Sequence, residues 1–258
     1  MDTCEKQMQD MLAELKESYG AAGIKIEFEE EGTSFEEAVR VKEIALGVGL
    51  HLTAKIGGCK AIKDINEAKL LGVSKIAAPM IESPFALRKF VNAAKSAYAS
   101  PQEGNVKLFI NIETITAYKF IDEILESSVN LGLDGIVVGR GDLTESAGLG
   151  REYINSEEIF NISSEIILKA KKQGLLCGIG GGVSVDSIPF FEKLSENLDF
   201  YETRKIIFDS EAVLGNNPEK GILKAIQFEL MWLRNKQNCF SVSNEDRARI
   251  NMLESNFS

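Results

Sequence analysis

The sequence predicts an α/β fold, a (β/α)8 TIM barrel that is modified and carries an extra helical segment at each end. Three observations favour this fold. The chain has 258 residues, which is near the usual size of such a barrel. Short apolar runs alternate with longer amphipathic stretches, a pattern typical of βα units. Polar or charged residues end many of the apolar runs, and in a barrel those ends meet at one mouth.

The strands and helices are expected in strict alternation. The strands are predicted at 23–29, 50–56, 74–80, 106–113, 134–139, 175–180 and 204–209, and the helices at 34–47, 60–71, 83–99, 114–130, 156–173 and 184–196. Ser34 and Glu37 form the pattern of a capping box, and Ser83 before Pro84 is typical of a helix start. Seven strand signals indicate either a modified barrel or one strand that the pattern does not reveal.

The two ends are predicted to be helical, at 1–20 and 218–258, and the whole chain (1–258) is expected to form one barrel domain. Apolar residues recur at helical spacing in the C-terminal extension: Ile222, Ile226, Leu230 and Leu233. The extension either caps the barrel or presents Phe228, Met231 and Trp232 to another subunit, because exposed large apolar groups usually mark a partner. We expect a homo-oligomer.

An open doubly wound sheet would also alternate strands and helices. That fold usually binds a pyrophosphate on a G-x-G-x-x-G turn after its first strand. Here the first strand ends in "EFEEEG", whose acidic side chains would repel a pyrophosphate. The closed barrel therefore fits better.

Composition limits the partners of the chain. With 29 Lys+Arg against 39 Asp+Glu, the formal charge of −10 disfavours binding to nucleic acid or to an anionic membrane. The four cysteines include no C-x-x-C pair, which argues against a structural zinc site and against a disulfide framework. No signal peptide and no long apolar run is found, so we expect a cytoplasmic protein.

Two of the predicted strands deliver a carboxylate at their downstream ends. "FINIET" ends in Glu113 and Thr114, and "LDGIVVGRGDL" places Asp142 just after the next strand. Neighbouring barrel strands would bring both acids to one rim, where carboxylates suit Mg²⁺ or Mn²⁺. The glycines of "GRGD" let the backbone approach an anion closely. The alternative is that each acid merely caps the helix that follows it.

These two stretches resemble a known family. "INIETITAYKFIDEIL" followed by "LDGIVVGRGDLTESAGLG" is similar to the class II pyruvate aldolase and citrate lyase β-subunit family, within the phosphoenolpyruvate/pyruvate barrel superfamily. The resemblance is strong over 106–150 and weaker from 23 to 183. Either motif alone is common by chance, but both at this spacing are specific.

The resemblance implies a metal-dependent carbon–carbon lyase, an aldolase that cleaves a 2-keto-4-hydroxy acid to pyruvate and an aldehyde. It implies that Glu113 and Asp142 bind Mg²⁺ or Mn²⁺, and that the substrate is a small keto acid, pyruvate or phosphoenolpyruvate-like. It also implies a set of substrate-binding residues: Asn111, Gly139, Arg140, Gly141 and Asp142.

The chain departs from the family at two positions with chemical roles. Lys55 stands where the aldolases have an arginine. A lysine keeps the positive charge, but its ammonium cannot bind a carboxylate through two parallel hydrogen bonds as a planar guanidinium does. Glu30 stands where they have a catalytic histidine, so it is a candidate base. Lys55 could instead form a Schiff base with the keto acid, or simply pair with a nearby acid. The lone His51 starts a strand and is expected to be structural.

Three further stretches have less specific interpretations. "GIGGGVS" (178–184) could hold a phosphate or carboxylate, or be a plain tight turn. Glu202, Arg204 and Lys205 lie around the start of the last predicted strand and are therefore expected at the bottom of the barrel, away from the mouth, so Arg204 is only a weak site candidate. The run 29–31, all glutamate, is expected to be a solvated loop.

Two other functions remain open from the sequence. A CoA-ester lyase of the citramalyl or malyl type would need a basic patch for the CoA phosphates, which the acidic chain disfavours. A non-catalytic relative could bind a keto acid after losing the histidine and the arginine.

Overall fold

The computed structural model describes residues 3–99, 106–215, 217–240 and 243–254. In this part of the chain eight strands close into one barrel in sequence order. They are β1 (Ala21–Glu27), β2 (His51–Lys55), β3 (Lys75–Ala78), β4 (Lys107–Ile112), β5 (Gly135–Gly139), β6 (Leu176–Gly180), β7 (Phe200–Glu202) and β8 (Ile206–Asp209). The predicted modified α/β barrel is confirmed, and each predicted strand has a counterpart.

The modification lies at the last two strands. The strands β1 to β7 pair with one another in parallel, whereas β8 is antiparallel to both β7 and β1. β7 is the strand that the sequence pattern does not reveal, because three residues are too few to show a period. A tight turn joins β7 to β8, with the Thr203 amide donating to the Ile206 carbonyl at 2.9 Å. This turn follows the carboxyl end of a parallel strand, so it lies at the mouth.

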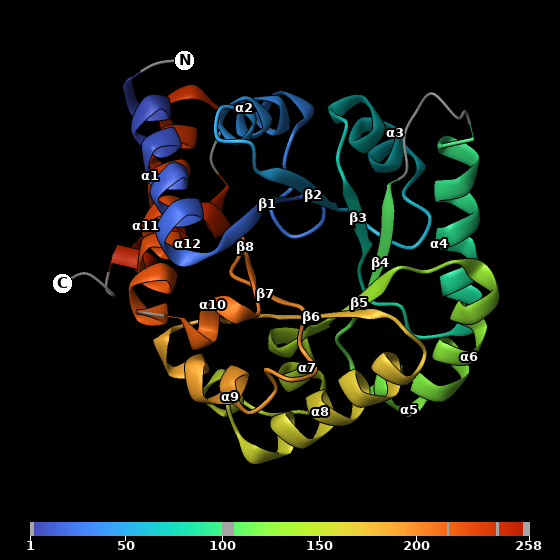
Figure 1. Cartoon of the computed structure of the whole chain (residues 1–258). Helices are drawn as coiled ribbons and strands as arrows, with labels where there is room; N and C mark the ends of the chain where they lie inside the picture. The colour runs from blue at the N-terminus through green and yellow to red at the C-terminus, as the bar shows by residue number, and fades with distance from the viewer. Residues whose placement is uncertain (1–2, 100–105, 216, 241–242, 255–258) are drawn as a thin grey trace.

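Helices surround the barrel (Figure 1). They are α1 (Thr3–Tyr19), α2 (Phe35–Leu46), α3 (Ile62–Leu71), α4 (Pro84–Ala97), α5 (Ile115–Lys119), α6 (Ile121–Leu131), α7 (Arg140–Ser146), α8 (Glu157–Lys172), α9 (Ile188–Glu192), α10 (Glu211–Leu214), α11 (Pro218–Cys239) and α12 (Asn244–Glu254), with short 3-10 turns η2 (Arg151–Tyr153) and η3 (Val185–Ser187). The predicted helix over 114–130 is divided at Phe120. The capping box of Ser34 and the Ser83 cap before Pro84 are both confirmed.

The inside of the barrel has an apolar floor. Ala77, Phe109, Val137, Phe200 and Ile207 form a separate buried cluster there. Lys75, at the start of β3, places its Nζ 4.2 and 3.9 Å from the ring centres of Phe109 and Phe200. Charged side chains occupy the layers above this floor, so the barrel is closed at the bottom and polar at the top.

The helical ends of the chain pack against each other on one side of the barrel (Figure 1). Phe228 and Trp232 of α11 are 1% and 4% exposed, and Met231 packs partly buried against the same core. The interpretation that Phe228 and Trp232 meet another subunit is therefore wrong, because the chain's own core takes up their apolar surface. Residues 255–258 of the predicted extension lie outside the described residues.

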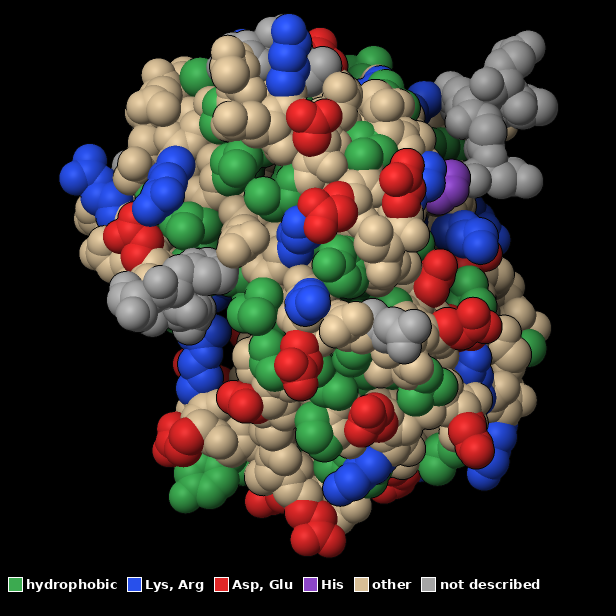
Figure 2. Space-filling model, turned by 60° about the vertical axis from the view of Figure 1, so that its left-hand side comes forward, with side chains coloured by type: hydrophobic (Ala, Val, Ile, Leu, Met, Phe, Trp, Pro, Cys, Tyr) green, Lys and Arg blue, Asp and Glu red, His purple; other side chains and the backbone are tan. Residues whose placement is uncertain are grey.

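The surface agrees with the charge of the sequence. Figure 2 shows acidic and basic side chains interspersed on one face, with apolar groups scattered among them. None of the described helices has both the length and the apolar character needed to cross a membrane.

Candidate active site

The carboxyl ends of the strands surround a cavity of about 790 Å³ at the barrel mouth. Its inner part is lined by charged and polar residues from five strands and the turns that follow them: Lys25, Glu27, Glu30, Lys55, Asn111, Glu113, Gly139, Gly141, Asp142, Glu202 and Arg204. The structure thus brings most of the predicted site residues into one cavity.

Glu113 lies at the end of β4 with its carboxylate held from two sides. Oε1 accepts a hydrogen bond from the Met80 amide at 2.8 Å, and Oε2 accepts one from Asn111 Nδ2 at 2.9 Å. Met80 has a left-handed backbone (φ 48°), which is uncommon outside glycine and is found at functional sites. Burial raises the pKa of Glu113, although the charge of Lys55 and these hydrogen bonds oppose the rise.

Asp142 lies in the first turn of α7 and faces the same cavity. Burial raises its pKa, and the nearby charges of Glu30 and Glu29 raise it further against the opposing charge of Lys55. Neither acid is an N-cap, because Thr114 caps α5 through its side chain and Gly139 precedes α7. The capping interpretation of Glu113 and Asp142 is therefore wrong.

Lys55 lies at the end of β2 and pairs with two carboxylates. Its Nζ is 2.8 Å from Glu29 Oε2 and 3.6 Å from Glu113 Oε2. Burial alone would lower the pKa of Lys55, but the charges of Glu113 and Glu27 and the hydrogen bond to Glu29 outweigh it and raise the pKa above its ordinary value. The ammonium is therefore charged at neutral pH.

A buried ion triad also lies in the barrel interior, and the sequence analysis did not predict it. Lys25 Nζ is 2.7 Å from both Glu27 Oε1 and Glu202 Oε1. Successive side chains of a strand face opposite sides, so Ile24 and Ile26 face the helices while Lys25 and Glu27 face the barrel interior. The signal was a lysine inside an apolar run, "GIKIEF".

Arg140 differs from the other predicted site residues, because its guanidinium does not line the cavity. The side chain is fully buried between Phe190 and Phe191, with its guanidinium carbon 4.8 Å from each ring centre. It donates to the carbonyls of Gly180 and Gly181, to Asn155 Oδ1 and to Ser187 Oγ. Burial lowers its pKa to about 9. Arg140 therefore ties the 180–182 loop to the 139–142 turn.

Two glycines at this rim, Gly139 and Gly181, allow neighbouring groups to pack directly against the backbone. A Cβ on Gly139 would lie 2.5 Å from Glu113 Oε2, and a Cβ on Gly181 would lie 2.4 Å from the Gly141 nitrogen. The "GIGGGVS" loop therefore packs directly on the "GRGD" turn.

Replacing Gly181 by alanine is expected to displace this turn. Gly181 and Gly148 both have left-handed backbones (φ +79° and +76°), but a Cβ on Gly148 would meet nothing within 4 Å. Gly148→Ala should lower the free energy of unfolding by about 1–2 kcal/mol through backbone strain alone. Gly181→Ala should cost about 1–3 kcal/mol more through overlap with Gly141. Denaturant unfolding measures both, and equal losses would contradict the packing of the two turns.

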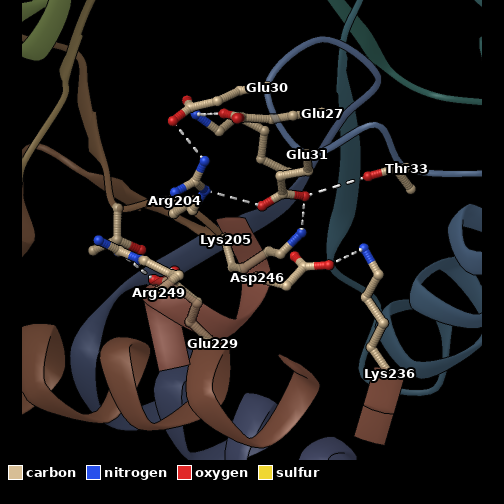
Figure 3. A network of polar contacts seen from close by, with 12 residues as sticks. Glu27, Glu30, Glu31, Thr33, Arg204, Lys205, Glu229, Lys236, Asp246 and Arg249 are labelled. Carbon is tan, nitrogen blue, oxygen red and sulfur yellow. Dashed lines mark hydrogen bonds and ion pairs between the residues drawn. The ribbon is translucent and has the colours of Figure 1, made fainter. Parts of the chain in front are cut away.

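Arg204 lies at the mouth rather than at the bottom of the barrel, so that prediction was wrong. It lies in the turn that enters the antiparallel strand β8, and its Nη2 is 2.7 Å from Glu30 Oε1 (Figure 3). Its Nε is 3.2 Å from Glu31 Oε1, and Lys205 pairs with the other oxygen of Glu31. Glu31 is thus a paired, largely buried carboxylate and not part of a solvated loop.

His51, in contrast, starts β2 with an exposed side chain at the opposite end of the barrel from the cavity. Within the described residues, no group of three or more histidine, cysteine or acidic side chains is arranged to hold a metal ion. Among the carboxylates that line the mouth, those of Glu113 and Asp142 could hold one.

A closed barrel with acidic and basic side chains at the carboxyl ends of its strands is a class of fold in which enzymes place their active sites. Residues 57–180 match the model of the HpcH/HpaI aldolase/citrate lyase family, which confirms the family resemblance of the sequence and supports a lyase-type function. The family is generally dependent on a divalent metal. No curated protein matches the sequence.

Solved structures of related fold include an HpcH/HpaI aldolase from Desulfitobacterium hafniense DCB-2, with a TM-score of 0.61, 15% identity, and coverage of 80% of this chain and 84% of that one. A second is an HpcH/HpaI aldolase/citrate lyase family protein from Burkholderia cenocepacia J2315, with a TM-score of 0.60, 17% identity, and 77% and 83% coverage. A third is a variant of the citrate synthase SbnG, with a TM-score of 0.56, 14% identity, and 77% and 81% coverage. At these identities the likeness is one of fold.

Proposed function

We propose that this protein is a metal-dependent aldolase that cleaves a 2-keto-4-hydroxy acid to pyruvate and an aldehyde. The observation that carries the proposal is the convergence of Glu113 and Asp142, from neighbouring strands, on one cavity beside Lys55. The match to an aldolase and citrate lyase family over residues 57–180 supports the same chemistry.

The mouth fits a divalent cation. Acidic residues outnumber basic ones among those that line the cavity, and Glu27 Oε2 is buried there without a hydrogen-bond partner among the described residues. The Glu113 carboxylate occupies the space that a side chain at position 139 would take, and Gly139 has no side chain. Glu113 and Asp142 would hold Mg²⁺ or Mn²⁺, which when bound supplies electrostatic stabilisation of an enolate.

The chain's own residues would bind and orient the keto acid. The Lys55 ammonium, held at the mouth by Glu29 and Glu113, would attract the carboxylate of the substrate. The 139–142 turn offers backbone N–H groups to the same carboxylate. Asn111 and the Met80 amide fix both oxygens of Glu113, so this carboxylate is oriented before substrate arrives.

Proton transfer needs a base in place of the family's histidine. Glu30, which occupies that position, is engaged by Arg204. Glu29 is a second candidate base: burial raises its pKa against the charge of Lys55, which lies 2.8 Å away, but its side chain does not line the cavity as Glu30 does. A carboxylate with a raised pKa can accept a proton from the 4-hydroxyl group and return it.

A Schiff-base mechanism is the second candidate, because Lys55 lies in the cavity. The nucleophile in that mechanism is the neutral amine. Burial would favour that form, but the surrounding carboxylates raise the pKa of Lys55 instead and keep it charged. This observation favours the metal-dependent mechanism.

The test is pyruvate release from a panel of 2-keto-4-hydroxy acids, with Mg²⁺ or Mn²⁺ and again after chelation. We expect turnover that disappears with the chelator and returns with the metal. Borohydride added with pyruvate is expected to leave the protein mass unchanged, whereas a pyruvate adduct on Lys55 would establish the Schiff base. Pyruvate binding without turnover of any substrate would indicate a non-catalytic relative, and turnover of acyl-CoA substrates alone would indicate the CoA-ester lyase.

A further inference from the structure

The cavity is larger than the keto acid requires. Pockets of roughly 300–1,000 Å³ hold drug-sized ligands, and this cavity, at about 790 Å³, falls in that range. Pyruvate has only six non-hydrogen atoms and would fill a small part of it. The remaining space lies beyond the Asp142 rim, between the loop after α7, the 180–184 loop and the C-terminal helices.

This outer part of the cavity has an aliphatic wall built from four separate segments of the chain. Its members are Leu149 and Ile154 after α7, Val183 after β6, Ile226 on α11, and Met252 and Leu253 on α12. Gly182 permits the close packing, because a Cβ there would lie 2.4 Å from Ile154 Cδ1. Segments distant in sequence thus contribute apolar groups to one compartment.

The charged groups around this compartment are engaged or exposed. Arg249 of α12 grips Glu229 of α11 at two points, with Nε–Oε1 and Nη2–Oε2 distances of 2.6 and 2.9 Å (Figure 3). Lys236 of α11 is 3.0 Å from Asp246 of α12. Arg151 and Glu152 are exposed at the rim. The ion pairs therefore fix α12 on α11 in the position where Met252 and Leu253 face the cavity.

We propose that this outer compartment, walled by α12, binds the aliphatic body of the aldehyde half of the substrate, so that α12 determines specificity. The inference rests on the proposed function, which makes that half of the substrate an aldehyde. The outer compartment belongs to the same cavity as Glu113 and Asp142, which supports the inference. An aldehyde whose chain lies in the compartment would have its carbonyl carbon at the mouth. An aldehyde of about five to eight carbons would use the apolar wall.

The test is a series of unbranched aldehydes from acetaldehyde to octanal, each condensed with pyruvate. For the unaltered protein we expect kcat/KM to rise roughly fourfold per methylene until the compartment is full. Met252→Glu should flatten the series while changing the acetaldehyde value less than about twofold, because only longer chains reach the wall. Leu223→Glu is the matched control, since Leu223 is an exposed apolar residue of α11 that does not line the cavity.

Two further measurements keep the inference testable if a variant folds poorly or no aldehyde reacts. Val183→Ser alters the same compartment from the barrel side and should also flatten the series. Calorimetric binding of n-octanol, which needs no aldol chemistry, should be lost in Val183→Ser and retained in Leu223→Glu. A chain-length series that is flat in the unaltered protein, or no octanol binding at all, would overturn the inference. Octanol binding without turnover of any aldehyde would contradict the proposed aldolase activity but not the inference about the outer compartment.

Discussion

Glu113→Gln is expected to lower kcat/KM for pyruvate release by roughly a thousandfold, the upper end of what one preorganised electrostatic group contributes. Glutamine keeps the volume and can still accept from the Met80 amide, which donates to Glu113 Oε1 at 2.8 Å. It removes the charge that would hold a divalent cation and leaves Lys55 with one carboxylate fewer. Steady-state kinetics measures the loss, and electron paramagnetic resonance of Mn²⁺ measures cation binding directly.

Asp142→Asn should give a loss of the same order, because the two carboxylates would act on one cation. Glu145→Gln is the matched control, since Glu145 lies one turn further along α7 and is exposed at the cavity rim. It removes the same charge from the same helix, and we expect less than about a threefold change from an exposed carboxylate. Unchanged Mn²⁺ binding in Glu113→Gln would show that the cation is held elsewhere.

The placement of Glu113 and Asp142 could be predicted because it depends on local patterns and one topological rule. Apolar runs locate the strands, and parallel neighbours in a barrel deliver their carboxyl ends to one rim. Neither step needs a side-chain contact between distant residues. The caps at Ser34 and Ser83 were predictable for the same reason, since each depends on residues within one helical turn.

Arg204 and Arg140 were misplaced because their positions depend on chain direction and on packing. The tight turn after the three-residue strand β7 reverses the direction of the chain, so that the start of β8 lies at the mouth and not at the expected bottom of the barrel. Arg140 sits in a motif that suggests ligand binding, but the aromatic pair Phe190 and Phe191, some fifty residues further along the chain, encloses its guanidinium. A contact of that kind leaves no periodic signal.

Lys25→Met should have the largest effect on stability among single changes to the barrel interior. Lys25 Nζ is 2.7 Å from the carboxylates of both Glu27 and Glu202, and all three side chains are buried. Removing one partner from a buried ion pair costs about 3–5 kcal/mol, because the remaining charge is left uncompensated in a low dielectric. Denaturant unfolding gives the free energy, and Glu27, whose pKa the charge of Lys25 lowers against its burial, should bind a proton in the variant at a pH where it is ionised in the unaltered protein.

Lys75→Met is the matched control for this result. Lys75 also points into the barrel, but it lies over the rings of Phe109 and Phe200 on the apolar floor. A methionine can keep that packing, so the loss should be about 1 kcal/mol, the size of a cation–π contact. Equal losses for the two lysines would mean that burial of the lysine stem, and not the ion triad, stabilises the barrel.

Replacing all three members of the triad separates stability from function. Lys25→Met with Glu27→Leu and Glu202→Leu removes the charges together, and such apolar replacements of buried ion pairs are often neutral or stabilising. The triple variant is therefore expected to recover most of the stability that Lys25→Met loses. The triad carries one net negative charge, and Lys55 stays paired with Glu29 and Glu113 without it, so the same variant should bind the anionic pyruvate more tightly. Recovered stability with tightened pyruvate binding would assign the triad to the charge balance of the mouth, whereas recovered stability with unchanged pyruvate binding would make the triad dispensable to the site.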